Sequence, residues 1–455
     1  MAQLPSYSQP PPYTWPTVPT RTLLPVFPPP EPLTKPPLPS PPRKPAFDAP
    51  YTLSTHLFPA AYLRTTELVP VPPPPPDSAT RAERQAIARK TMQELKDLRG
   101  STVPRGTKQV LWNCANRYVR NGLDGANANG LTLFFAHANG FPKEIWEPVL
   151  SHLLASPAGA AIDEVWTWES VQHGDACLIN ADKLGGVFDW SDNARDILNF
   201  LLHYLPSKVS SSTLPTHLVR LPAQETEYRK TNPFKHRTFV AVGHSYGGCT
   251  STLAALTHPA LFSSIFLIDP VIVKPPFPDV AIPASQRVDQ LVLGALTRRD
   301  TWSSTDEALA LFVKSPFFGA WDPAVLRVYI ECGTFTTRDP VTNAQVVKLK
   351  MPGIQEAVVF SETHTEYEVF HQLPGLDERI ELRWIVPGRE GAGEFGPPGS
   401  TRERVWVRPK NASNVRIPGA GHLIPQEAPQ LLAQDIAQFI ERKYGPMRPG
   451  ARANL

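Results

Sequence analysis

Apolar runs alternate with amphipathic stretches along most of the chain. The runs "LTLFFA" (131–136) and "FVAV" (239–242) contain almost no polar positions, which is typical of strands buried on both faces. The stretches "DWSDNARDILNFLLHYL" (189–205) and "QLLAQDIAQFIERK" (430–443) repeat apolar residues at helical spacing. Strands that alternate with helices predict an α/β fold, in which helices flank a mostly parallel central sheet.

Proline divides the chain into segments. Of its 53 prolines, 25 lie before residue 77, and proline lacks the amide donor that helices and inner strands need. We therefore predict a disordered N-terminal segment with polyproline II character at residues 1–77. The other predicted segments are a helical linker at 78–103, two parts of a core at 104–270 and 379–443, an inserted helical cap at 271–378 and a tail at 444–455.

Charge and cysteine content indicate which classes of protein this sequence does not fit. The net charge is +3 over 455 residues, and no long basic run indicates a nucleic-acid surface. No apolar run reaches the ~18 residues of a transmembrane segment, and no secretion signal opens the chain. The widely spaced cysteines are predicted to be buried free thiols, and no metal or cofactor is expected. They are Cys114, Cys177, Cys249 and Cys332.

Ser245 has the sequence context of a catalytic nucleophile. It lies in "GHSYGG", between an apolar strand and a predicted helix, as the serine of a nucleophile elbow does. Gly243 and Gly247 fit this turn because side chains at those positions would collide with neighbouring backbone. The alternative is a glycine-rich turn in which the serine caps the helix.

His422 is the candidate base. It follows the last predicted strand and precedes the last helix, as the chain order of α/β-hydrolases requires. His137 and His244 lie inside the turn after 131–136 and inside the elbow, so we expect them to be structural or to line the pocket. The alternative for His422 is also a structural role.

The carboxylate that orients the base has two candidate positions. Asp269 stands at the C-terminal end of "IFLID", where ligand-facing residues collect in parallel sheets. The other position follows "ELRWIVPG", but Gly391 occupies it, and Glu390 and Glu394 are out of register. We favour Asp269, keep Glu390 as the alternative, and note that Asp269 could instead cap a turn before Pro270.

An acyl-transfer site also needs donors for an oxyanion. The backbone N–H that follows the nucleophile belongs to Tyr246. The second donor should come from the turn "HANGF" after the strand 131–136, where Asn139 has the matching position.

Several longer motifs carry a family resemblance. They are "YTLSTHLFPAAYLR", "AHANGFPKEIWEPV", "DEVWTWESVQHGDACLIN", "DWSDNARDIL", "GHSYGG", "LIDPVI" and "ELRWIVPG". Together they resemble a fungal branch of the α/β-hydrolases, which includes the acyl-CoA hydrolase of mycophenolic acid biosynthesis, Alternaria toxin-cluster hydrolases and yeast-type peroxisomal lipases. The resemblance begins near residue 51 and implies Ser245 as nucleophile, Asp269 as acid and His422 as base.

Motifs at the two ends predict partners and location. Ala453-Asn454-Leu455 resembles a weak form of the Ser-Lys-Leu address, which suggests a peroxisomal import receptor as partner and a peroxisomal location, otherwise a cytoplasmic one. The motif "PPPY" (10–13) fits a WW-domain ligand, and "PSPPRKP" (39–45) fits an SH3-type groove. A plain disordered tail is the alternative for both proline motifs.

These features predict a serine hydrolase of the esterase, lipase or acyl-CoA thioesterase type, which cleaves an ester or thioester with an apolar acyl group. Apolar cap residues in "LALFVKSPFFGAW" could line the acyl pocket or only pack the cap. The alternative is a proline-rich interaction protein that uses the hydrolase fold as a scaffold.

Overall fold

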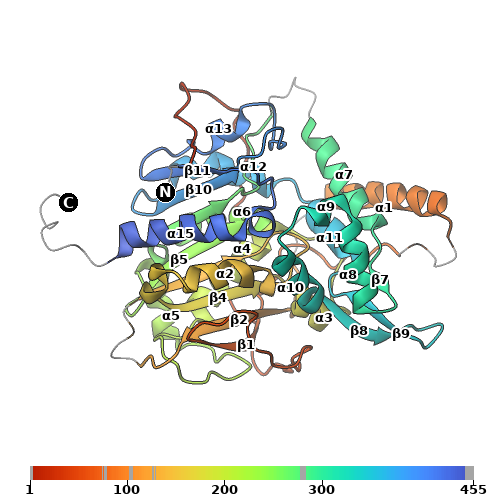
Figure 1. Ribbon diagram of the computed structural model, residues 1–455, viewed down its shortest axis with the longest axis horizontal. Coiled ribbons are helices and arrows are strands. Elements are labelled where there is room, and N and C mark those ends of the chain that lie inside the picture. Colours follow the sequence, from red (N-terminus) through yellow and green to blue (C-terminus); the bar gives the residue numbers. More distant parts are fainter. Residues whose placement is uncertain are drawn as a thin grey trace, which may run out of the picture.

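The computed structural model describes residues 4–73, 75, 79–101, 106–124, 128, 130–276 and 283–445. An eight-stranded sheet crosses the molecule (Figure 1). Its strands, in spatial order, are β1 (Tyr51–Pro59), β2 (Trp112–Arg120), β4 (Ile162–Glu169), β3 (Leu131–Ala136), β5 (Thr238–His244), β6 (Ser264–Ile268), β10 (Glu381–Pro387) and β11 (Ala412–Ile417). The pairs β1–β2 and β2–β4 are antiparallel and the others are parallel, which confirms the predicted fold class.

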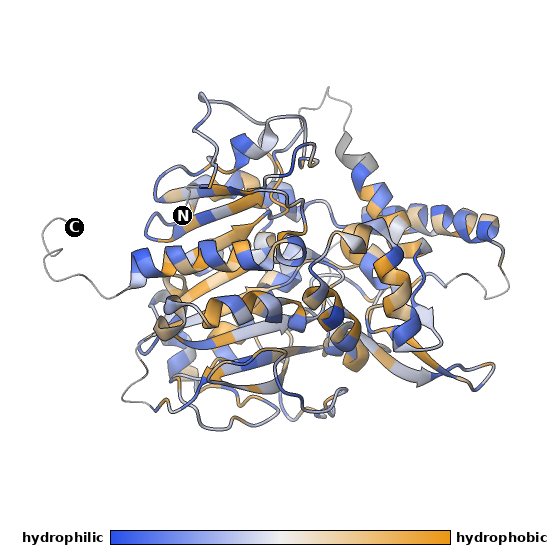
Figure 2. Cartoon of the chain, viewed as in Figure 1, coloured by the Kyte–Doolittle hydropathy of each residue, from blue (hydrophilic) through white to orange (hydrophobic). Residues whose placement is uncertain are grey.

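Helices cover both faces of this sheet, so its central strands are apolar on both sides. Leu133 and Val240 belong to the core beneath α2 (Glu147–Leu154) and α15 (Pro429–Tyr444). Phe134 and Ala241 belong to the opposite core, which α4 (Trp190–Asn199) and α6 (Tyr246–Thr257) cover. Figure 2 shows the consequence: the inner strands are mostly orange, whereas α15 is blue on its outer side.

The cap enters the chain between β6 and β10. It contains α7 (Pro283–Thr297), β7 (Thr301–Trp302), α8 (Thr305–Lys314), α9 (Pro316–Gly319), α10 (Pro323–Gly333), β8 (Thr334–Arg338), β9 (Gln345–Leu349), α11 (Gly353–Phe360) and α12 (Thr365–Gln372). The predicted helical cap also contains strands, because β7, β9 and β8 form a second, antiparallel sheet. The run "EAVVF" lies within α11.

The N-terminal prolines do not leave their segment disordered. β1 lies at the edge of the main sheet, beside β2, and begins directly after this segment. Upstream of β1, the backbone has almost no regular structure, but isolated aromatic residues such as Tyr7, Tyr13 and Trp15 pack against the core. We call residues 4–50 the N-terminal arm. The prediction from proline content missed the anchors of this arm, which are single side chains.

Arg21 joins the arm to both the core and the cap. Its Nε and Nη2 lie 2.8 and 2.7 Å from the Glu368 carboxylate on α12, and its Nη1 pairs with Asp189 at the start of α4. About a third of the Arg21 side chain is exposed, so solvent screens these pairs.

Replacing Arg21 with alanine should lower the free energy of unfolding by about 1–2 kcal/mol, because two nearly buried carboxylates lose their partner. Urea unfolding measures this loss. Arg379→Ala is the matched control, since its pair with Asp377 is 82% exposed on the arginine side. Equal stability of the two variants would contradict a structural role for the arm.

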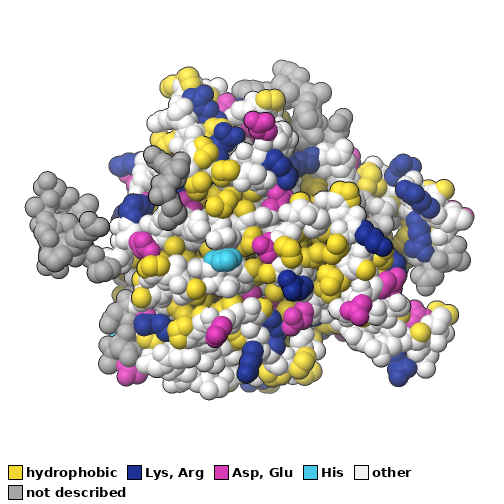
Figure 3. Space-filling view, viewed as in Figure 1, with side chains coloured by type: hydrophobic (Ala, Val, Ile, Leu, Met, Phe, Trp, Pro, Cys, Tyr) yellow, Lys and Arg dark blue, Asp and Glu magenta, His cyan; other side chains and the backbone are white. Residues whose placement is uncertain are grey.

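The outer surface and the remaining predictions are simple to place. Figure 3 shows positive and negative side chains interspersed over the viewed face. All four cysteines are buried and free, as predicted. No helix within the described ranges has the length and apolar character of a membrane span. The C-terminal tripeptide Ala453–Leu455 lies outside the described residues.

Candidate active site

Ser245 occupies the sharp turn between β5 and α6. Its φ of 55° is a strained conformation for a residue with a side chain. A Cβ on Gly247 would come within 2.4 Å of the Ala136 carbonyl oxygen, and one on Gly243 within 2.5 Å of the Gly248 Cα. The close approach of backbone therefore explains both glycines. The turn places the Ser245 hydroxyl at the N-terminal end of α6, where the helix dipole favours negative charge.

The structure brings Ser245, His422 and Asp269 together. His422 lies in the loop between β11 and α14 (Ile424–Glu427), and its Nε2 is 3.0 Å from the Ser245 Oγ. Its Nδ1 is 2.6 Å from Oδ2 of Asp269, directly after β6. Glu390 is exposed in the turn after β10, so Asp269 is the carboxylate that contacts the imidazole. Such a chain allows the serine proton to pass to Nε2 while the carboxylate holds Nδ1–H.

Asp269 is held as an anion inside the protein. It is 2% exposed, and its second oxygen, Oδ1, pairs with Nη2 of Arg404. Burial alone would raise the pKa of the Asp269 carboxyl, but the Arg404 guanidinium and the hydrogen bond to His422 lower it to about 2. No feature of the sequence predicted Arg404, because its run "STRER" has the composition of a solvated helix.

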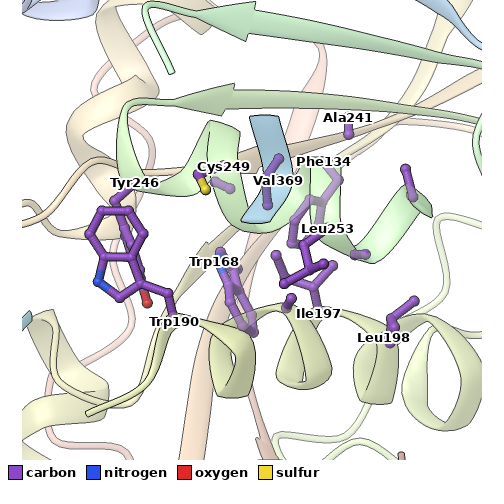
Figure 4. Packing of buried hydrophobic residues seen from close by; sticks show 14 of the residues in the cluster. Phe134, Trp168, Trp190, Ile197, Leu198, Ala241, Tyr246, Cys249, Leu253 and Val369 are labelled. Carbon is purple, nitrogen blue, oxygen red and sulfur yellow. The ribbon is translucent and has the colours of Figure 1, made fainter. Parts of the chain in front are cut away.

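The predicted oxyanion donors belong to two turns, one directly after Ser245 and one after β3. Tyr246 opens α6, and Trp190 packs against its ring at a centroid distance of 5.0 Å, which fixes the start of the helix (Figure 4). Asn139 lies in the turn after β3. Among the hydrogen bonds of the described residues, neither backbone N–H is a donor to another group.

The Asn139 side chain is fixed by two partners that sequence reasoning missed. Its Nδ2 donates to the Glu356 carbonyl on α11 at 3.0 Å, and its Oδ1 accepts from Nε2 of His173 at 3.0 Å. Burial and the neighbouring His137 lower the pKa of His173 well below its usual range, so it is neutral. The cap thus braces the turn that holds the second donor.

The other two histidines have supporting positions, as expected. His244 donates from Nε2 to the carbonyl oxygen of His422 at 2.9 Å. Burial lowers its pKa to about 3, so it stays neutral. His137 donates from Nδ1 to the Ala138 carbonyl and accepts the Ser170 N–H at Nε2, and burial lowers its pKa to about 4. Both act as hydrogen-bonded supports for the loops around the serine.

A buried ionic cluster underlies the same turn. Ligand atoms of Cys114, Glu169 and Asp175 lie within 4.8 Å of one another, as in a metal site. However, Nζ of Lys143 lies 2.8 Å from Asp175 and 3.4 Å from Glu169, and Nζ of Lys350 lies 2.7 Å from Asp175, so ammonium groups already pair with both carboxylates. Glu169 also accepts the Lys143 backbone N–H at 3.1 Å. The motif "AHANGFPKE" thus contains both the turn and Lys143, whose charged side chain anchors the turn to Glu169 and Asp175.

The alpha/beta hydrolase family model matches residues 133–435. The chain belongs to this family and is a hydrolase. It is 27% identical over 430 residues to the type I acyl-CoA thioesterase mpaH of Penicillium roqueforti, covering 78% of this chain and 89% of the relative. The solved structure of the peroxisomal alpha-beta-hydrolase Lpx1 of Saccharomyces cerevisiae aligns with a TM-score of 0.57 at 22% identity, over 89% of this chain and 93% of that one.

A third relative comes from Alternaria, a genus named in the resemblance above. The abhydrolase domain-containing protein ACTT2 of Alternaria alternata is 26% identical over 230 residues, which is 45% of this chain and 83% of the relative. The resemblance to a fungal hydrolase branch is therefore confirmed.

Proposed function

We propose that the protein is a serine hydrolase that cleaves an ester or thioester through an acyl-enzyme. The hydrogen-bonded chain from Ser245 Oγ through His422 to Asp269 is the observation that supports this most directly. Ser245 attacks the substrate carbonyl as Nε2 of His422 takes its proton. Asp269, buried and ionised, holds Nδ1–H and stabilises the imidazolium that forms.

The remaining steps, departure of the leaving group and hydrolysis of the acyl-enzyme, use the same groups. The backbone N–H groups of Tyr246 and Asn139 donate to the oxyanion of each tetrahedral intermediate. His422 returns the proton to the leaving alcohol or thiol, and then activates water, which releases the acid and restores Ser245. The reaction needs no metal or cofactor.

The surroundings of the site favour an apolar acyl group. Phe141, on the oxyanion turn, packs against the cap residues Trp321 and Tyr329 at centroid distances of 5.5 and 5.9 Å. Phe318 and Phe312 extend this aromatic cluster into α9 and α8. Apolar side chains of the cap therefore lie beside the turn that would hold the carbonyl, although they also pack the cap against the core.

The thioester is our preferred substrate because a relative with long coverage is an acyl-CoA thioesterase. Arg298 and Arg299, which could contact CoA phosphates, pair with Glu356 and Glu307 within the chain. They would have to exchange these partners to bind CoA. Substrate recognition by other cap residues is compatible with the same mechanism.

Location and protein partners remain proposals. A peroxisomal location is supported by the peroxisomal membrane protein LPX1 of Saccharomyces cerevisiae, 26% identical over 69% of this chain. The WW-domain and SH3 proposals are weakened by contacts of the arm. The Tyr13 hydroxyl donates to the Glu403 carbonyl at 2.6 Å, and Arg43 pairs with Glu147. The alternative of a scaffold without activity has no support in these contacts or in the relatives.

A matched panel of acyl-CoAs and p-nitrophenyl esters of equal chain length tests the proposal. We expect wild type to hydrolyse both classes, with a higher kcat/KM for the class of its natural substrate and for longer apolar acyl groups. The ratio between the classes identifies it as a thioesterase or an esterase. Absence of turnover on both classes, together with no labelling by a fluorophosphonate, would contradict the proposed function.

A further inference from the structure

Arg404 contacts the candidate catalytic acid from the side opposite the histidine. It is the last residue of α13 (Ser400–Arg404), between β10 and β11, and is 2% exposed. Its Nη2 pairs with Oδ1 of Asp269, and its Nη1 donates to the Pro270 carbonyl at 2.5 Å. One guanidinium therefore binds the side chain of the acid and the backbone that follows it.

We propose that Arg404 is a positioning residue, which holds Oδ1 of Asp269 so that Oδ2 stays on Nδ1 of His422. This inference rests on the proposed function, since it assumes that Asp269 serves as the acid of the site. Arg404 does not touch the reacting atoms. It acts through the orientation and charge of the carboxylate.

The backbone at Asp269 explains why such a residue is needed. Its φ of 35° lies in the left-handed region, which is strained for aspartate, so surrounding contacts must fix it. The Asp269 N–H donates to Ile385 at 2.8 Å, and Arg404 supplies the contacts on the other side. The planar fork of arginine reaches two acceptors at once, which the single ammonium of lysine does with less geometric control.

Other elements hold Arg404 itself in place. Glu394 caps α13, accepting the N–H groups of Gly399 at 2.9 Å and of Thr401 at 2.5 Å. The N-terminal arm covers the same helix through Tyr13, which donates to the Glu403 carbonyl at 2.6 Å. Hydrogen bonds therefore fix α13 to the loop after β10 and to the arm. The position of Arg404, at the end of α13, is fixed with it.

Several charged or titratable groups face the Asp269 carboxylate. Arg404 approaches from α13, His422 from the loop after β11, His244 from β5 and Arg287 from α7. The Phe395 ring lies between three of them: 5.2 Å from the His422 ring, and 4.1 and 5.0 Å from the guanidinium carbons of Arg287 and Arg404. Removing Arg404 removes a full positive charge from the surroundings of Asp269. The pair of Asp269 and His422 should therefore stay protonated up to a higher pH.

The test compares Arg404→Met and Arg404→Lys with wild type, measuring kcat, the pH profile of kcat/KM and thermal unfolding. Arg404→Met should lower kcat by at least about tenfold and move the acid limb of the profile to higher pH. Arg404→Lys should restore the acid limb and only part of kcat. The matched control is Arg237→Met, which breaks an equally buried pair with Glu164 ahead of β5, away from the site.

Each outcome has one meaning. A shifted acid limb in Arg404→Met, its restoration by lysine and an unshifted limb in Arg237→Met support the inference. Should Arg404→Met not fold, a wild-type kcat in Arg404→Lys would overturn it. Equal kcat and pH profiles in folded Arg404→Met and wild type would also overturn it. Wild type and Ser245→Ala equally inactive on the whole panel would instead remove the proposed function.

Discussion

Ser245→Ala is expected to reduce kcat by roughly 10⁶-fold, to the level that binding and the oxyanion donors alone support. Alanine keeps the volume of the turn, but it has no oxygen to attack the carbonyl or to pass a proton to His422. The strained backbone at position 245 remains, so the fold should be unchanged. Hydrolysis of the preferred panel substrate and labelling by a fluorophosphonate measure the effect.

Ser251→Ala is the control for this result. Ser251 is fully buried in α6, six residues after Ser245, and plays no part in the proposed mechanism. It should keep the wild-type kcat and the wild-type label. Hydrolysis by Ser245→Ala at more than about a hundredth of the wild-type rate would contradict the role of Ser245, because no other serine of the described residues is hydrogen-bonded to the His422 ring.

The centre of the site was predictable because its signals are local. The glycines around Ser245 are required by a turn only a few residues long, and the short apolar strands before Ser245 and Asp269 mark their places at one edge of the sheet. His422 follows from chain order alone. The constraints on Ser245 and Asp269 act within a few residues of each, and the order of the elements locates His422, so one sequence is enough to read them.

The supports of the site were not predictable, because they come from distant segments. Arg404 is 135 residues from Asp269, in a run that reads as a polar surface helix. The arm is anchored by single side chains such as Tyr13 and Arg21, which a composition rich in proline obscures. The three cap strands have two to five residues, too few for an alternating pattern to stand out.

Asp269→Asn is expected to lower kcat at neutral pH by about 10⁴-fold. Arg404 is a donor only, so the asparagine carbonyl should turn toward it and the amide NH₂ toward Nδ1 of His422. Nδ1 would then accept, and the hydrogen of neutral imidazole would move to Nε2. A ring with Nε2–H cannot take the proton of Ser245. The pair with Arg404 thus makes the wrong tautomer the stable one.

Glu390→Gln is the matched control, since it neutralises the alternative carboxylate in an exposed turn. Glu390→Gln should leave kcat unchanged. A large loss of kcat in Glu390→Gln, with a wild-type kcat in Asp269→Asn, would instead identify Glu390 as the acid. Acid unfolding gives a second check. The pKa of Asp269 is depressed from 3.8 to about 2, so its charge stabilises the fold above about pH 4, and this contribution disappears as the pH falls toward 2. Asp269→Asn should lack that part of the acid-dependent loss, because an amide does not titrate.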